Sequence, residues 1–270
     1  MPSHLPHATE RLPTWREGWG RTGRIVLLLD FDGTLAPIVE QPEDAEMPPA
    51  TRAVLERLRE MAGVEMAVVS GRGMVDARNR AALRGIAYAG NHGMEIEGAG
   101  LRRIHREAAA ARPALEAVAR QLESDLAAID GAMVEDKGLT LSVHYRRVAR
   151  DQVAELRKRV LAASAERSEL KVTEGKEVLE VRPAVDWDKG KAVEFIVGEI
   201  DPPPGCPVIY LGDDTTDEDA FQALGSWAGG SGEGVFVGEQ PPAKTAAASY
   251  LRDPGEVADL LVALALPEDG

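Results

Sequence analysis

The chain has 270 residues, with 31 Lys and Arg against 45 Asp and Glu, so its formal net charge at pH 7 is −14. Nucleic acids and anionic membranes bind basic faces, and the sequence shows no basic block, so we expect neither as a partner. The 44% hydrophobic and 28% charged residues exclude disordered and fibrous classes, and because only 4% are aromatic, the core must be aliphatic.

The N-terminal segment and the cysteine content bear on where the protein acts. Residues 1–22 contain Pro, His, Trp and Arg without periodicity, and we expect an irregular leader there. The sequence has no apolar signal core and no run of about 18 apolar residues, which predicts a soluble cytoplasmic protein. The single cysteine, Cys206, excludes an intrachain disulfide, and without a cluster of His and Cys residues a zinc site is not expected.

Apolar runs alternate with helical patterns from residue 25 onward. The run at 25–29 predicts a strand buried on both faces, and the runs at 66–69 and 208–211 have the same character. The segment 51–61 predicts a crossover helix between the first two strands. This order is typical of a doubly wound parallel α/β sheet. Further strands are predicted at 86–89 and 235–237, and further helices at 188–199 and 254–265.

The pattern changes between residues 100 and 183. An Ala-rich helix is expected over 106–129, and the alternation at 140–145 predicts a strand with one polar face. Glu174-Gly175-Lys176 separates two strand-like runs and indicates a hairpin. We therefore expect residues 100–183 to form a smaller inserted α/β domain with a sheet covered on one side, and residues 23–99 and 184–270 to form the core. The other elements expected in the insert are a strand at 133–137, a helix near 150–164 and hairpin strands at 170–172 and 178–182.

Polar side chains follow three of the predicted core strands. Asp30 and Asp32 follow the first, Ser70 follows the second, and Asp213 and Asp214 follow another. Reactive groups in an open α/β sheet lie at the carboxyl ends of its strands, so we expect these side chains to converge. Taken singly, each Asp is explained equally well as a helix cap or a turn residue; it is the convergence that favours a site.

This convergence predicts a Mg²⁺ site that also binds a phosphate. Carboxylate oxygens are hard ligands of the kind that Mg²⁺ prefers. Gly33 lets backbone N–H groups approach an anion, and Thr34 can add a hydroxyl donor. Lys189 and Ser70 would offset the repulsion between the carboxylates and a phosphate. Asp217 could support the carboxylates that bind the metal without binding the metal itself.

Four segments resemble, in order and position, the motifs of the haloacid dehalogenase superfamily of phosphatases. They are Asp30-Phe31-Asp32-Gly33-Thr34, Val69-Ser70-Gly71-Arg72, Lys189-Gly190 and Gly212-Asp213-Asp214. Longer stretches over about residues 24–265 resemble the trehalose-6-phosphate phosphatase family within it. They are residues 32–38, Gly90-Asn91-His92-Gly93-Met94-Glu95, Glu135-Asp136-Lys137-Gly138 with His144-Tyr145-Arg146, Glu180-Val181-Arg182-Pro183, and residues 212–219.

The resemblance implies a Rossmann-like core with a cap domain, and a Mg²⁺-dependent phosphomonoester hydrolase that converts trehalose 6-phosphate into trehalose and phosphate. Asp30 would be the nucleophile that forms an aspartyl-phosphate, and Asp32 would be the general acid and then the base. Ser70 and Lys189 would bind phosphoryl oxygens. The residues implied to hold Mg²⁺ are Asp30, the main-chain carbonyl of Asp32, and Asp213, with Asp214 or Asp217 in support.

Sugar hydroxyls suit charged and amide side chains, so the insert and the strand-end loops are expected to supply the substrate contacts. The resemblance implies sugar contacts for Glu135, Lys137 and Glu180. His144 and Arg146 could either contact the sugar or form a salt-bridged surface. The full set of expected substrate-binding residues is Gly33, Thr34, Gly71, Arg72, Asn91, Glu135, Lys137, His144, Arg146 and Glu180.

Three other functions stay open at this point. The substrate could be another sugar phosphate, such as sucrose phosphate or a glucosyl- or mannosyl-phosphoglycerate. The chain could instead be a receiver-type phospho-acceptor module, although such a module needs neither the second Asp at 32 nor a large insert. It could also be an inactive sugar-phosphate sensor. Nothing in the sequence predicts a protein partner or an oligomeric state.

Overall fold

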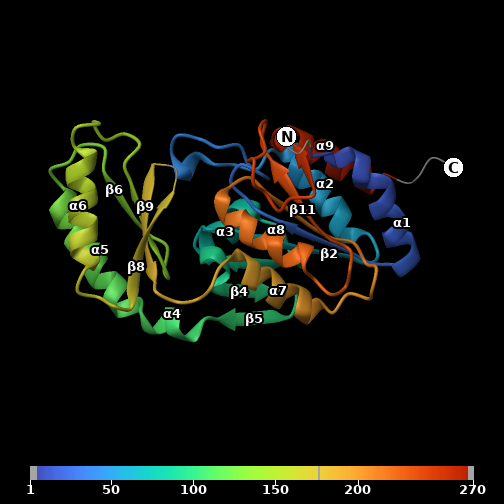
Figure 1. Ribbon diagram of the computed structural model, residues 1–270, viewed down its shortest axis with the longest axis horizontal. Helices are drawn as coiled ribbons and strands as arrows, with labels where there is room; N and C mark the ends of the chain where they lie inside the picture. The colour runs from blue at the N-terminus through green and yellow to red at the C-terminus, as the bar shows by residue number, and fades with distance from the viewer. Residues whose placement is uncertain (1–4, 176, 267–270) are drawn as a thin grey trace. The chain divides into compact units, whose positions relative to one another are not determined.

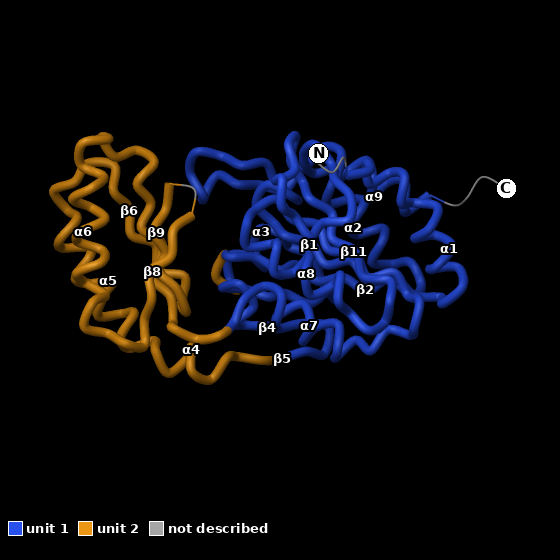
Figure 2. Tube along the Cα trace, viewed as in Figure 1, with its two compact units in different colours: residues 1–71, 75–102, 187–270 blue, residues 72–74, 103–186 orange. Residues whose placement is uncertain are grey.

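The computed structural model describes residues 5–175 and 177–266, and this part of the chain divides into two compact units (Figure 2). Unit 1 takes the described residues of 1–71, 75–102 and 187–270, and unit 2 takes 72–74 and 103–186. The short segment 72–74 clusters with unit 2, although the sequence analysis assigned it to the core.

A sheet with the strand order β12-β11-β10-β1-β2-β3-β4-β5 is the framework of unit 1 within the described residues (Figure 1). The central strand β1 (Ile25–Leu29) pairs in parallel with β10 (Val208–Gly212) and with β2 (Val64–Val69). The parallel pairing continues to β3 on one side and to β11 and β12 on the other, whereas β4 is antiparallel to β3. The other strands are β3 (Ala87–Gly90), β4 (Glu95–Gly98), β5 (Leu101–Ile104), β11 (Gly232–Val237) and β12 (Ser249–Leu251).

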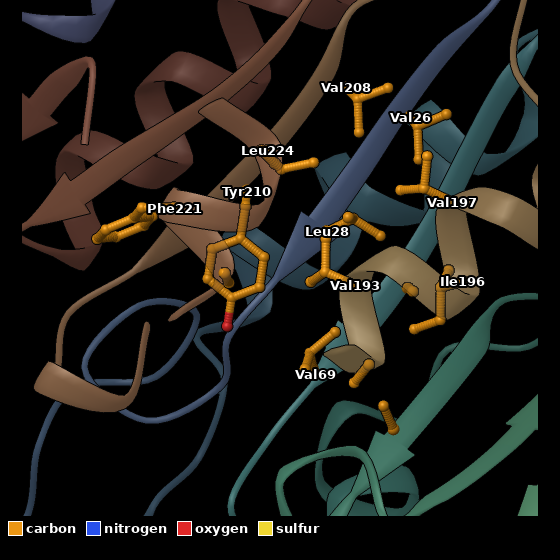
Figure 3. Packing of buried hydrophobic residues seen from close by; sticks show 14 of the residues in the cluster. Val26, Leu28, Val69, Val193, Ile196, Val197, Val208, Tyr210, Phe221 and Leu224 are labelled. Atoms are coloured by element: carbon orange, nitrogen blue, oxygen red, sulfur yellow. The ribbon is translucent and has the colours of Figure 1, made fainter. Parts of the chain in front are cut away.

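Every residue of β1 and of β10 is buried, which explains their continuous apolar sequences. Alternate side chains of these strands, among them Val26 and Leu28, share one cluster with residues of α7 (Lys189–Ile200) and α8 (Glu218–Gly225) (Figure 3). The helices α7 and α8 therefore cover one face of the sheet. The other helices of the core are α1 (Leu12–Thr22), α2 (Pro49–Glu60), α3 (Met74–Ala81) and α9 (Pro254–Ala265), with short 3₁₀ turns η1 (Ala8–Arg11), η2 (Pro42–Asp44), η3 (Asn91–Gly93) and η4 (Thr215–Asp217).

The prediction of an irregular leader is wrong for residues 8–22, which form η1 and α1; residues 1–4 lie outside the described part. Gly23, in the left-handed conformation with φ 69°, ends α1. Trp15 is buried against the core, and Arg11 forms a two-pronged ion pair with Glu233, with nitrogen–oxygen distances of 2.9 and 2.5 Å. The helix is thus held by contacts with residues more than 200 positions away, which local periodicity cannot reveal.

Several elements differ from the sequence-based expectation. The single helix expected over 106–129 is two helices, α4 (Arg106–Ala110) and α5 (Arg112–Leu126). Pro113 lies in the first turn of α5, and since proline has no N–H and its ring crowds the preceding turn, one continuous helix is broken there. The hairpin of β4 and β5 and the helix α3 were missed, and β12 follows the strand that was expected to be the last.

Unit 2 contains an antiparallel sheet with the order β6-β7-β9-β8 in the described residues. Its strands are β6 (Met133–Asp136), β7 (Leu141–His144), β8 (Leu170–Gly175) and β9 (Val178–Pro183), and α5 and α6 (Val153–Ser164) supply its helical layer. Leu141, Val143, Leu179 and Val181 share a core with these helices. Alternation then leaves a polar face, on which Glu135, Ser142, Glu180 and Thr173 form one row across the four strands. Lys176 of the predicted hairpin turn lies outside the described residues.

None of the helices in the described residues combines the length and the apolar composition needed to cross a membrane.

The turn between β6 and β7 depends on Asp136. Its two carboxylate oxygens accept hydrogen bonds from Arg112 of α5 at 2.6 and 2.8 Å, and one of them also accepts the N–H of Gly138 at 2.9 Å. Although partial burial opposes the effect, the hydrogen bonds from Arg112 and Gly138 lower the pKa of Asp136. Because the pKa is lowered on folding, the carboxylate contributes stability above its unfolded pKa of about 3.9 and loses that contribution as the pH falls through the folded value.

We predict that Asp136→Asn lowers the free energy of unfolding by about 0.5–1 kcal/mol at neutral pH. Urea titrations at about pH 7 and about pH 3 would measure this, and the difference from the wild type should be smaller at the lower pH. Glu116→Gln removes a second, more exposed partner of Arg112 and serves as the control, with a smaller loss. An equal loss from Asp136→Asn at both pH values would contradict the prediction.

Candidate active site

The buried ammonium group of Lys189 lies between two buried carboxylates. Its Nζ donates to Asp30 Oδ1 at 2.8 Å and to Asp217 Oδ1 at 2.6 Å, and all three side chains are at most 6% exposed. Asp30 directly follows β1, and Lys189 is the first residue of α7. The preceding Asp188 caps this helix by accepting the N–H of Lys191 at 2.8 Å, which fixes the start of α7 and with it the position of Lys189.

A third carboxylate, that of Asp213 after β10, completes the cluster. Asp30, Asp213 and Asp217 each offer a carboxylate oxygen, and these oxygens all lie within 4.8 Å of one another. Two glycines make this approach possible. A Cβ on Gly33, which also has a φ of +79°, would lie 2.1 Å from Asp213 Oδ2, and a Cβ on Gly212 would lie 2.3 Å from Asp217 Cγ.

The charges in this cluster do not balance. Burial raises the pKa of Asp30 well above its ordinary value, with Asp217 and Asp213 adding to the rise and Lys189 opposing it. Burial and the charge of Asp217 likewise raise the pKa of Asp213 to about 7. Burial works against the charge of Lys189, but Asp217 and Asp30 still raise its pKa well above the ordinary value. Three carboxylates therefore share one ammonium group, so a further cation would be strongly favoured here.

The donor set fits Mg²⁺. Carboxylate oxygens on a rigid strand-end frame are the protein ligands that this hard cation takes, and it usually retains waters or substrate oxygens in its other positions. Thr34, which follows Gly33 in the chain, has a fully buried Oγ1 without a hydrogen-bond partner among residues 5–175 and 177–266. A buried hydroxyl normally has a partner, so this atom indicates a polar group that binds in the loop.

The structure places the other core residues of the predicted site in the loops that follow β1, β2 and β3. Asp32 is half-buried, in a turn closed by a hydrogen bond of 2.7 Å from Gly33 N to Ala36 O. Ser70 is 1% exposed, and its carbonyl accepts the N–H of His92 at 2.9 Å. Gly71 follows directly. Asn91 is fully buried, and its amide donates to Glu95 Oε2 at 2.7 Å.

Asp214 behaves differently from its neighbour Asp213. Its side chain is exposed and caps the turn η4 by accepting the N–H of Thr215 at 2.6 Å. Its own N–H donates to Asp217 Oδ2 at 3.0 Å. Of the two residues that the sequence left open as metal supports, Asp217 joins the buried cluster, and the Asp214 carboxylate is used as a cap.

In unit 2, the predicted sugar-binding residues lie on or next to the polar face of the sheet. His144 Nε2 and Glu135 Oε2 are 2.9 Å apart, and Lys137 Nζ is 3.9 Å from Glu180 Oε1. Burial opposes the effect, but the hydrogen bond from His144 and the charge of Lys137 lower the pKa of Glu135. These four residues form one network in which carboxylate groups alternate with the imidazole and ammonium groups.

Two other residues predicted to bind substrate also belong to unit 2. Arg146 lies beyond the end of β7, where its Nε donates to Glu177 Oε2 at 2.7 Å, so an ion pair occupies it. Arg72 is buried, and its charge acts on Glu135.

Three polar residues near these sites were not predicted from the sequence. Tyr210 of β10 donates its hydroxyl to Asp217 Oδ1 at 2.5 Å. Ser142 and Arg182 lie on the polar face of unit 2, and Arg182 Nη1 is 3.8 Å from Glu180 Oε2. The period of two along β7 and β9 could have identified Ser142 and Arg182 from the sequence. Tyr210, the one aromatic residue in an aliphatic strand, carried a weaker signal.

Comparison of folds defines the class of protein. The structure matches that of a haloacid dehalogenase-like hydrolase from Bacteroides thetaiotaomicron with a TM-score of 0.60, covering 89% of this chain and 99% of that one at 18% identity. The C-terminal domain of Candida albicans trehalose-6-phosphate phosphatase matches with a TM-score of 0.79 and 26% identity, covering 98% and 99% of the two chains. The predicted haloacid dehalogenase-like α/β fold class is thereby confirmed.

Sequence relatives define the family. The family model for trehalose-phosphatase matches residues 28–255. The trehalose-phosphate phosphatase of Mycobacterium marinum is 40% identical over 268 residues, which cover 97% of this chain and 66% of that protein. The chain belongs to the trehalose-phosphatase family, and it spans just under two thirds of the length of this relative. The resemblance found in the sequence motifs is thus confirmed at the level of the family.

We predict that Gly212→Ala lowers the free energy of unfolding by about 1–3 kcal/mol, because the added Cβ would displace the Asp217 carboxylate. Gly198→Ala, in the helix α7 with no atom within 4 Å of the added methyl group, is the control and should be neutral or stabilising by up to about 1 kcal/mol. Urea unfolding of the two variants would measure both effects. Equal stabilities of the two variants would show that the site tolerates a side chain at position 212.

Proposed function

We propose that the chain is a Mg²⁺-dependent phosphatase that hydrolyses trehalose 6-phosphate to trehalose and phosphate through an aspartyl-phosphate. The observation that carries this proposal is the buried Lys189 between Asp30 and Asp217, with Asp213 beside them. Membership of the trehalose-phosphatase family and the names of its relatives, which are trehalose-phosphate phosphatases, support the choice of substrate.

In the first step a carboxylate oxygen of Asp30 would attack the phosphorus atom, while the bond from phosphorus to the sugar oxygen breaks. Asp32, two residues further along the same loop, would give its proton to that leaving oxygen. In the second step a water would lose a proton to Asp32 and attack the phosphorus, and the bond to Asp30 would break to release phosphate. Atoms and protons balance over the two steps, and both residues return to their starting states.

Attack by Asp30 requires its ionised form, which burial by itself disfavours. The ammonium group of Lys189, 2.8 Å from Asp30 Oδ1, favours that form and reduces the repulsion between Asp30 and an incoming phosphate. Mg²⁺, held by Asp30, Asp213 and the main-chain carbonyl of Asp32 with Asp217 in support, would add positive charge that stabilises the phosphoryl oxygens. Ser70 and the N–H groups of the Gly33-Thr34 turn would hold the same oxygens.

Unit 2 would act as the cap that recognises the sugar. Its polar face presents carboxylate, imidazole and ammonium groups from Glu135, Glu180, His144 and Lys137, which can each donate to or accept from sugar hydroxyls. His144 and Glu135 hydrogen-bond to each other, and a sugar hydroxyl that displaces this contact can offer both a donor and an acceptor in its place. A ligand that displaces these contacts but lacks the matching hydroxyls would leave polar groups unpaired, which disfavours its binding.

The first experiment is a phosphate-release screen over trehalose 6-phosphate, sucrose phosphate, and glucosyl- and mannosyl-phosphoglycerate. We expect trehalose 6-phosphate to give the highest kcat/KM, with activity lost in EDTA and restored by Mg²⁺. Asp30→Asn should reduce release by at least about a thousandfold, and Asp44→Asn, an exposed residue of η2, should leave it unchanged. A higher kcat/KM for another sugar phosphate would reject the substrate, and full activity in EDTA would reject the metal.

The role of the polar face can be tested separately from the chemistry. Glu135→Ala should lower kcat/KM for trehalose 6-phosphate by about 10- to 100-fold, and it should change kcat/KM for the small ester para-nitrophenyl phosphate by less than about threefold. Glu174→Ala is a matched control, because Glu174 also belongs to the sheet of unit 2 but pairs with Arg157 of the helical layer. Equal losses on both substrates would contradict a role of Glu135 in binding the sugar.

A further inference from the structure

Tyr210 is the central residue of β10, and its hydroxyl reaches the acidic cluster from inside the core. The side chain is fully buried, and the hydroxyl donates to Asp217 Oδ1 at 2.5 Å. The ring packs edge-on against Phe221 of α8, with the two centroids 5.8 Å apart and the planes at 74° (Figure 3). Since strand and helix both restrain the ring, the position of the hydroxyl is fixed before any ligand binds.

Three donors hold the Asp217 carboxylate, one from α7, one from β10 and one from the loop residue that precedes η4. Oδ1 accepts from Lys189 of α7 and from Tyr210 of β10, and Oδ2 accepts the N–H of Asp214 at 3.0 Å. Of the two donors on Oδ1, Lys189 is charged and can also turn toward Asp30, whereas Tyr210 is neutral and stays in place. The hydroxyl of Tyr210 therefore determines the position of Asp217 Oδ1.

The same oxygen competes with Asp30 for Lys189. The ammonium group is 2.6 Å from Asp217 Oδ1 and 2.8 Å from Asp30 Oδ1, so the two carboxylates share it. A hydrogen bond donated to Asp217 Oδ1 reduces the negative potential that this oxygen presents to Lys189. Without that hydrogen bond, Asp217 Oδ1 would present more negative potential and hold the lysine more tightly, and Asp30 would lose part of its counter-charge.

We propose that Tyr210 is a positioning residue of this site. Its hydroxyl fixes the orientation of Asp217, and through Asp217 it keeps Lys189 in contact with Asp30. It thereby also keeps the carboxylates of the acidic cluster in the positions that a bound cation needs. The inference rests on the proposed function, since it assigns a role within the same phosphatase site. Tyr210 does not touch the substrate in this mechanism. It acts only through the carboxylate that it binds.

The test is Tyr210→Phe, which removes the hydroxyl and keeps the ring. Tyr88→Phe is the matched control. Tyr88 belongs to β3 of the same sheet and is 3% exposed, and its hydroxyl donates to a backbone carbonyl, that of Leu83, at 2.7 Å. Each substitution thus deletes one buried tyrosine hydroxyl that makes a hydrogen bond, but only Tyr210 contacts a charged residue of the site.

Two quantities would be measured for the wild type and both variants. The first is kcat and KM for para-nitrophenyl phosphate, and the second is the Mg²⁺ concentration that gives half of the maximal increase in Tm after the metal is stripped with EDTA. For Tyr210→Phe we expect kcat to fall about tenfold with KM within about twofold, and the Mg²⁺ midpoint to rise at least about threefold. For Tyr88→Phe, kcat, KM and the midpoint should stay within about twofold of the wild type, even if Tm falls.

The proposal is overturned if Tyr210→Phe changes only one of the two quantities or neither, because a merely structural hydroxyl would lower Tm in both variants without moving kcat or the Mg²⁺ midpoint. Failure of the proposed function looks different. If the wild type hydrolyses no phosphate ester, the phosphatase assignment fails, and the Mg²⁺ midpoint, which needs no turnover, decides the role of Tyr210 by itself.

Discussion

The buried ion pair of Lys189 with Asp30 and Asp217 is the interaction on which the site depends. Burying an ammonium group is costly unless charged partners and hydrogen bonds surround it, and here two carboxylates do so at 2.8 and 2.6 Å. The pair also constrains the fold, because it joins the end of β1, the start of α7 and the turn after β10. Its excess of negative charge, to which Asp213 contributes, would be offset by a cation bound at this place.

Backbone geometry brings these charges together. Parallel pairing of β1 with β10 places Asp30 and Asp213 at the same edge of the sheet, and the glycines at 33 and 212 remove the side chains that would keep the carboxylates apart. The N-cap of α7 fixes the lysine. The strand pairing, the two glycines and the helix cap each position one or two charged groups. The reactivity proposed for Asp30 arises because these groups meet at the same edge of the sheet.

Unit 2 also carries charged side chains, but it arranges them differently from unit 1. Its antiparallel sheet buries one face against α5 and α6, so the other face is free to carry polar groups, and the register aligns Glu135 with Ser142 and Glu180. The charges there are paired and partly exposed, unlike the buried and unbalanced cluster of unit 1. This contrast agrees with the roles proposed above, in which unit 1 performs the chemistry and unit 2 binds the sugar.

The sequence by itself determined the α/β class, the strand-end positions of Asp30 and Asp213, and the family. It could do so because each buried strand and each loop motif is a continuous stretch of residues. The tertiary structure decided that Asp217, rather than Asp214, joins the cluster, that Tyr210 binds it, and that residues 8–22 are ordered on the core. The acidic cluster and the docking of residues 8–22 depend on contacts between distant segments, such as Lys189 with Asp30 and Arg11 with Glu233. Tyr210 is only seven positions from Asp217, but their contact depends on how the chain turns after β10. Local periodicity carries no information about such contacts, since it reports only which face of an element is buried.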